Sequence, residues 1–162
     1  GGLALPARAG VRQAAANGFE LENSALVQAP AGKVWKAMTA GIDHRWPKDH
    51  SWWGSKSTLR LDARAGGCFC EPAGERQAQH LQVALVEPGQ RLRLLGGLGP
   101  WQAMGLHGVA ESTLEPQGQA TRVVWRYTVD GYTTTDPTAL AAVVDRVQAR
   151  QLDALVRWAG TR

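Results

Sequence analysis

The chain has 162 residues, and its 18 Lys and Arg against 14 Asp and Glu give a formal net charge of +4. A chain of this length is expected to form one domain around a single core. The basic residues are spread singly from Arg8 to Arg162, without the run or stripe that nucleic-acid binding needs. No stretch approaches the ~18 apolar residues of a membrane span. We therefore expect neither a nucleic-acid partner nor a membrane span.

Residues 1–17 lack apolar periodicity and are predicted to be a flexible N-terminal tail. They contain Ala7-Arg8-Ala9, a small-x-small pattern like the end of a secretory signal. Two interpretations remain open, a signal-peptide remnant and a plain tail rich in Ala and Gly. The first predicts a periplasmic or secreted protein, and the second a cytoplasmic one.

Residues 18–160 are predicted to form the single domain, which begins with a strand over 19–27. Pro30 is then expected to start a helix, because proline is favoured in a first helical turn, and Gly41 to break it. The Trp-rich stretch 43–54 is predicted as short helical turns and loop. A half-buried strand over 57–63 follows, because Leu59 and Leu61 alternate with polar residues.

Turn residues then divide the chain into an antiparallel meander. Gly66-Gly67 leads into a strand over 68–71, and the stretches 72–74 and 88–89 are predicted as the next turns. Two long strands follow the glycine-rich segment 96–100. Asp136 and Pro137 are expected to cap and begin a final helix that runs to Gly160, about 23 residues or ~34 Å long. This element order is α+β.

Four segments, PAGKVWKAMT, ARAGGCFCE, LVEPGQRLRLLGGLGP and VDRVQARQLDALVRW, occur in the order typical of one superfamily. Over about Phe19–Ala159 the chain resembles the START and polyketide-cyclase (SRPBCC) superfamily. It is most similar to exported bacterial polyketide-cyclase-like proteins and activators of heat-shock ATPases. The resemblance implies a helix-grip fold, in which a curved seven-stranded antiparallel sheet surrounds the long C-terminal helix and encloses an apolar cavity.

Strand parity and the resemblance together predict the residues that line this cavity. The predicted ligand-binding residues are Trp46, Trp52, Trp53, Phe69, Leu81, Val83, Met104, Leu106, Trp125, Tyr127, Tyr132, Val143, Val144 and Val147. Tyr127 and Tyr132 are the expected polar anchors, since a buried phenol needs a hydrogen-bond partner. The glycines at 96, 97, 99 and 108 are expected to leave space for a ligand. The alternative is a filled core.

Cys68 and Cys70 are two residues apart on a predicted strand, so their Cα atoms would lie about 6.6 Å apart, near the upper limit for a disulfide. A hairpin turn about Ala73-Gly74 would place Cys68 opposite His80, on the face away from Phe69. Three alternatives remain open: packed or free thiols, a strained disulfide or redox pair, and a metal site that lacks a fourth ligand. We expect neither a metal nor a cofactor.

The pairs Asp43-His44 and Asp49-His50 have residue types suited to acid-base chemistry. Residues adjacent in sequence rarely hydrogen-bond to each other, so the pairs are predicted to cap helical turns in a Trp-rich loop.

These features favour a protein that binds or transports an apolar or aromatic small molecule, as a monomer or weak dimer. One alternative is a cyclase- or dehydratase-like enzyme that uses the same pocket, with Tyr127, Tyr132 or His50 placing an acid-base step. The other is a protein-interaction module like the ATPase activators.

Overall fold

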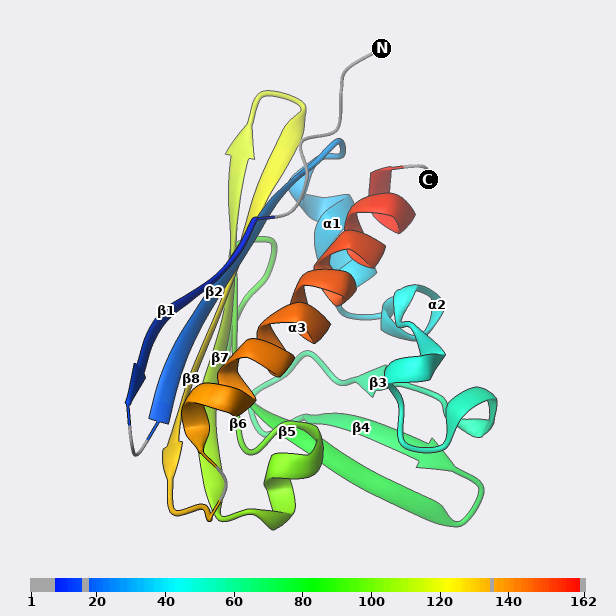
Figure 1. Ribbon diagram of the computed structural model, residues 1–162. Coiled ribbons are helices and arrows are strands. Elements are labelled where there is room, and N and C mark those ends of the chain that lie inside the picture. The colour runs from blue at the N-terminus through cyan, green and yellow to red at the C-terminus, as the bar shows by residue number, and fades with distance from the viewer. Residues whose placement is uncertain (1–7, 16–17, 135, 161–162) are drawn as a thin grey trace.

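An antiparallel sheet of eight strands forms one side of the molecule in the computed structural model, which describes residues 8–15, 18–134 and 136–160 (Figure 1). In sheet order the strands are β1 (Arg8–Ala15), β2 (Gly18–Val27), β8 (Ala120–Gly131), β7 (Leu106–Gln117), β6 (Arg91–Leu95), β5 (Arg76–Glu87), β4 (Cys68–Ala73) and β3 (Arg60–Leu61). From β2 the chain crosses to β3 at the other edge of the sheet, and β3 to β8 then form a continuous meander that ends beside β2. The α+β helix-grip prediction is confirmed, with eight strands in place of the seven expected.

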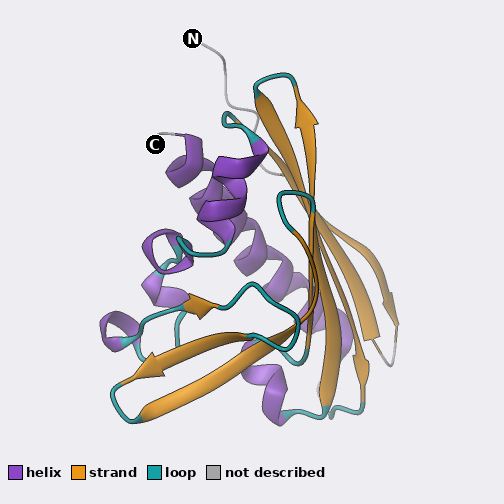
Figure 2. Cartoon of the chain, turned by 180° about the vertical axis from the view of Figure 1, so that it is seen from behind, coloured by secondary structure: helices purple, strands orange, loops and turns teal. Residues whose placement is uncertain are grey.

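All helices lie on one side of the sheet (Figure 2). The longest, α3 (Pro137–Gly160), crosses the sheet and packs on β1 and β2. The shorter ones are α1 (Ala31–Met38), α2 (Ile42–Arg45), η1 (Lys48–His50), η2 (Gly54–Lys56) and η3 (Gly99–Ala103). No helix within the described residues is long and apolar enough to cross a membrane.

The final helix begins and ends where the sequence predicts. Asp136 accepts a hydrogen bond from the backbone N–H of Thr138 at 3.0 Å, and Pro137 occupies the first helical position. The first backbone N–H groups of a helix have no acceptor within the helix. Asp136 supplies an acceptor for one of them, and Pro137 has no N–H that needs one. Because α3 is 24 residues long, it can contact both the strands at the sheet edge and the short helices α1 and α2.

Strand β1 was not predicted, since Arg8–Ala15 falls in the segment expected to be flexible. It pairs antiparallel with β2 and has an irregularity in register between Val11 and Gln13. Pairing at a sheet edge uses backbone N–H and C=O groups, and therefore needs no apolar alternation. The rest of the predicted tail, residues 1–7 and 16–17, lies outside the described residues.

Two predicted boundaries in the middle of the chain differ from the structure. The strand expected over 57–63 is only Arg60–Leu61, although Leu59 and Leu61 are both buried as their alternation predicts. Strand β4 continues through Ala73, so the hairpin turns at Gly74 and Glu75. Gly74 has a φ of 63°, a left-handed conformation that glycine adopts without strain.

Candidate functional site

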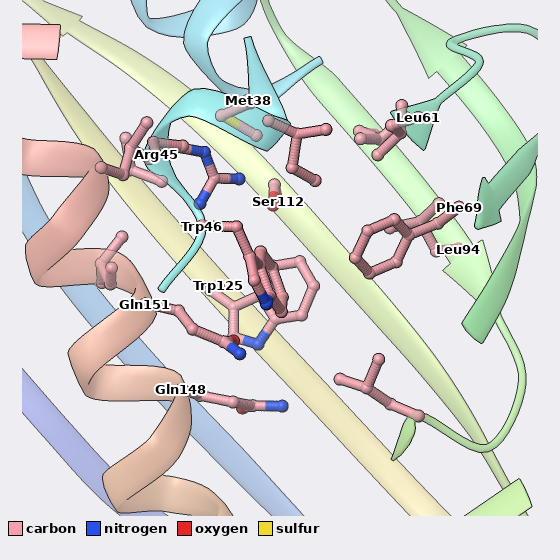
Figure 3. Close-up of a pocket in the computed structure, with 16 residues that line it drawn as sticks. Met38, Arg45, Trp46, Leu61, Phe69, Leu94, Ser112, Trp125, Gln148 and Gln151 are labelled. Atoms are coloured by element: carbon pink, nitrogen blue, oxygen red, sulfur yellow. The ribbon is translucent and has the colours of Figure 1, made fainter. Parts of the chain in front are cut away.

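A cavity of about 70 Å³ lies between the sheet and the C-terminal half of α3 (Figure 3). Its apolar wall includes Phe69 and Leu94 from the sheet, Met38 from α1, and Leu152 and Leu155 from α3. One water needs about 10–15 Å³ measured in this way, whereas small-molecule pockets usually have ~300–1,000 Å³. In this conformation the cavity therefore has room for a small organic group or a few waters.

Several polar groups border this apolar space. Gln148 is only 3% exposed, and neither its amide oxygen nor its amide nitrogen has a hydrogen-bond partner within the described chain. The indole Nε1 of Trp125 is buried and unpartnered in the same way. Buried polar atoms in native proteins are nearly always paired, with protein or with ordered water. These atoms therefore mark positions where a bound molecule could donate or accept hydrogen bonds.

Arg45, the last residue of α2, brings a charge to the cavity (Figure 3). Its Nε donates to the backbone oxygen of Ala37 at 2.9 Å, and its Cζ lies 5.8 Å from the centroid of the Trp46 ring. Burial lowers the pKa of Arg45 to about 10, because a charge is disfavoured away from water. The guanidinium nevertheless remains protonated at neutral pH.

A second hollow of about 210 Å³ adjoins the cavity. Trp46, Leu98, Gln148 and Gln151 line both spaces and so form the partition between them. Beyond this partition the second hollow is bordered by side chains from the N-terminal half of α3, the Trp-rich loop, β5 and η3. They include Trp52, His80, Trp101, Val143, Val144 and Val147.

A buried carboxylate fastens the Trp-rich loop to the sheet. Glu71 is 1% exposed, and its Oε2 accepts hydrogen bonds from Trp52 N at 2.7 Å and from Ser57 Oγ at 2.6 Å. Its Oε1 lies 2.7 Å from Nε2 of His80. Burial alone would raise the pKa of Glu71, but hydrogen bonds from Ser57, His80 and Trp52 outweigh it and hold the pKa below 4.5.

His80 faces the interior because of a β-bulge. In the β4–β5 pairing Phe69 lies opposite Leu81 and Cys70 opposite Gln79, which leaves His80 as the extra residue. The prediction that His80 lies opposite Cys68, on the outer face, is therefore wrong, because Cys68 pairs with Gln82. His80 is 7% exposed, and its Nδ1 has no partner among the described residues.

The two cysteines form a disulfide on the opposite side of β4 from Phe69 and Glu71. Their Cα atoms are 5.4 Å apart, closer than the ~6.6 Å of a regular strand and within the usual disulfide range. Of the three alternatives left open by the sequence, the structure contains the disulfide. No cluster of three or more His, Cys, Asp or Glu side chains suited to a metal occurs in the described residues.

Seven of the predicted ligand-binding residues border one of the two spaces. Phe69 and Trp125 line the cavity, Trp46 lines both spaces, and Trp52, Val143, Val144 and Val147 line the second hollow. Phe69 and Trp125 face the interior, as strand parity predicts. The three α3 valines lie on one side of the helix, as its 3.6-residue period predicts.

The other predicted residues lie elsewhere. Leu81, Val83, Leu106 and Tyr127 are packed in the core, and Met104 is partly buried against it. Trp53 packs beneath Arg76. Tyr132 is 80% exposed, because it follows the end of β8, where strand parity no longer applies.

Tyr127 is not an anchor with a free hydroxyl. The hydroxyl accepts a hydrogen bond from Leu98 N and donates one to Gly96 O, each at 3.0 Å, and its ring stacks on Trp101. Nor does Gly108 leave a void, since a Cβ there would lie 2.6 Å from Cε2 of Tyr127. The glycine admits the tyrosine ring instead of a ligand.

Within the described residues, neither acid-histidine pair is joined by a hydrogen bond between its two side chains. Asp43 accepts a hydrogen bond from Leu59 N at 2.8 Å and pairs with Lys48, while His44 stacks on Trp158. Burial alone would raise the pKa of Asp43, but the hydrogen bonds from Lys48 and Leu59 outweigh burial and hold the pKa below its usual value. Asp49 and His50 are 4.0 Å apart, and only His50 borders the second hollow.

Sequence reasoning missed most of the polar groups at the site. Gln148 interrupts the apolar stripe of α3 between Val144 and Leu152, which is a signal that could have been recognised. No comparable signal exists for Arg45 or Ser112, because their approach to the cavity depends on how α2 and β7 pack in three dimensions.

Comparisons with known proteins identify one family and a large group of similar folds. The family described as polyketide cyclase / dehydrase and lipid transport matches residues 18–160. No curated protein matches the chain.

Among solved structures, an uncharacterised protein from Rhizobium leguminosarum has 18% identity and a TM-score of 0.63, over 98% of this chain and 100% of that one. Ara h 8.0201 has 12% identity and a TM-score of 0.65, over 88% and 98%. CalU16 from Micromonospora echinospora has 19% identity and a TM-score of 0.58, over 94% and 84%. At these identities the likeness concerns the fold.

Proposed function

Because the chain belongs to the polyketide cyclase / dehydrase and lipid transport family of the SRPBCC superfamily, we propose that it binds an apolar or aromatic small molecule between the sheet and α3. One observation carries this proposal. Buried, unpartnered polar atoms of Gln148 and Trp125 border a cavity whose wall is otherwise mainly apolar. A few convergent polar atoms in an apolar space are typical of a small-molecule site.

The available space supports a ligand larger than the cavity alone can hold. The cavity of about 70 Å³ and the hollow of about 210 Å³ are separated by Trp46, Leu98, Gln148 and Gln151. All of these side chains except Gln148 are partly exposed. Rotamer changes in the partly exposed ones would join the two spaces, and such changes are common on binding.

Native mass spectrometry of protein purified from its source tests this proposal. We expect a co-purifying apolar molecule that is lost in Ser112→Leu, where the larger side chain fills the cavity. Thr113→Leu is the matched control, because Thr113 is the next residue on β7 and does not line the cavity. A folded wild-type protein that repeatedly carries no ligand, and binds none of a panel of apolar compounds, would refute the proposal.

The second candidate, a cyclase- or dehydratase-like enzyme, is favoured by Glu71 and His80. Glu71 holds Nε2 of His80, which leaves its buried Nδ1 as the nitrogen that could exchange a proton at the second hollow. An enzyme would convert the recovered ligand into a product of different mass or retention time, and His80→Gln would stop conversion but not binding. Recovery of unchanged ligand from wild-type protein would exclude this candidate.

The disulfide supports a place for the protein in an oxidising compartment, such as the periplasm or the extracellular space. Thiol titration of protein from its source, denatured without reductant, is expected to find no free thiol. Reduction before titration should release two, because the chain has 2 Cys. Two free thiols without reduction would contradict the assignment.

A further inference from the structure

Arg45 is a half-buried cation that lines the cavity and has no carboxylate partner among the described residues. Neither of its terminal guanidinium nitrogens has a hydrogen-bond acceptor in the part of the chain that the structure describes, and no carboxylate there lies within 4.0 Å. Among the described residues, its one hydrogen bond runs from Nε to Ala37 O, at 2.9 Å. A cation beside an apolar space is partly removed from water, and a bound anion there would restore the interactions that it has lost.

The guanidinium of Arg45 belongs to the lining of the cavity. In the view of Figure 3 the guanidinium and Ser112 project to one end of the labelled group, and the side chain of Gln148 projects to the other, and all three residues line the cavity. Ser112 is 2% exposed, and no protein hydrogen bond uses its hydroxyl within the described residues. An anion at this end would thus meet a cation and a hydroxyl donor together.

The space beyond Arg45 extends along α3, with apolar side chains at both ends and two glutamines between them. Leu155 and Leu152 flank the cavity, Gln151 and Gln148 form the partition, and Val147 to Val143 border the second hollow. The helix rises 1.5 Å per residue, so the distance from Leu155 to Val143 is roughly 18 Å. This length suits an extended molecule with one polar end.

We propose that the ligand is an extended amphipathic monocarboxylic acid, an inference that rests on the proposed function. Its carboxylate pairs with the guanidinium of Arg45, a polar group at mid-length contacts Gln148 and Trp125 Nε1, and its apolar end occupies the hollow beside Val143 and Val147. A guanidinium fork matches a planar carboxylate. A single cation neutralises one negative charge, whereas a phosphate dianion would leave one negative charge unpaired in the same apolar space.

The test compares decanoate with decanol, which have the same chain length and differ in charge. Titrations near neutral pH would follow heat and tryptophan fluorescence, since Trp46 and Trp125 line the cavity. We expect wild-type protein to bind decanoate roughly tenfold to hundredfold more tightly, because hydrogen bonds to charged groups contribute about 1.5–3 kcal/mol. Arg45→Met should lose this preference and still bind decanol.

Arg146→Met is the matched control, because Arg146 is exposed on α3 and lines neither space. It should retain the preference for the acid. Equal affinity of the wild-type protein for acid and alcohol would overturn the proposal without any variant, as would an unchanged preference in folded Arg45→Met. Failure of wild-type protein to bind either compound would overturn the proposed function itself.

Discussion

Replacing Glu71 by Gln tests whether the buried carboxylate holds the Trp-rich loop on the sheet. The oxygen of the new amide can still accept from Trp52 N and Ser57 Oγ, which lie 2.7 and 2.6 Å from Oε2 of Glu71. Its nitrogen can meet His80 if the imidazole changes tautomer. The side-chain shape is therefore kept, and the negative charge is what the substitution removes.

The expected loss follows from these bonds. A hydrogen bond to a charged group is roughly twice as strong as a neutral one, so each of the three short bonds should lose about 1 kcal/mol. We expect Glu71→Gln to lower the free energy of unfolding by about 2–3 kcal/mol. For a chain of this length, that corresponds to a fall in Tm of roughly 4–12 °C.

The loss should also depend on pH. The folded-state pKa of Glu71 lies below its ordinary value of 4.5, so the unfolded chain takes up the proton first as the pH falls. The carboxylate therefore stabilises the fold fully when the pH is above 4.5. This stabilisation disappears as the pH falls through the lower, folded-state pKa. The difference between wild type and Glu71→Gln should narrow over that acidic range.

Urea unfolding at several pH values, followed by tryptophan fluorescence, measures both effects. Glu75→Gln is the control, because it removes the same charge from the exposed β4–β5 turn and should change stability by less than about 0.5 kcal/mol. The reasoning would be refuted if Glu71→Gln matched this control at neutral pH. A difference that stayed constant in acid would refute the pH argument.

Three further predictions concern packing, ionisation and capping. Gly108→Ala should lower the free energy of unfolding by about 1–3 kcal/mol, because its Cβ would lie 2.6 Å from the Tyr127 ring. Gly32→Ala in α1, where a Cβ meets nothing within 4 Å, should raise it by up to ~1 kcal/mol. A urea midpoint equal to that of wild type would contradict the prediction for either variant. Burial raises the pKa of Tyr127 to about 12, so in Tyr132→Phe the absorbance of the remaining tyrosine should titrate there, and a midpoint near 10.0 would show that the hydroxyl is not buried. Asp136→Ala should lower the free energy of unfolding by about 0.5–2 kcal/mol, through loss of the α3 cap, and a change below this range would exclude a capping role.

The fold and part of the site could be predicted from local patterns. Alternation of apolar residues over 19–27 predicted β2, and the Asp136-Pro137 start with three- and four-residue spacing predicted α3 to its last residue. The same periods placed Phe69, Trp125 and the α3 valines beside the internal spaces. Such patterns are reliable because burial of one face repeats at the period of the element itself.

The polar groups of the site could not be predicted from local patterns, because packing between distant segments positions them. The bulge that turns His80 inward adds one residue to β5 and reverses the parity on which the sequence argument depended. Tyr127 fills the space at Gly108, and Arg45 reaches the cavity from a helix of 4 residues. Local patterns were enough to predict every strand of the sheet except β1, the long helix and the family. Contacts between elements far apart in the chain determined the cavity, its charge and its unpaired atoms, because no local period records them.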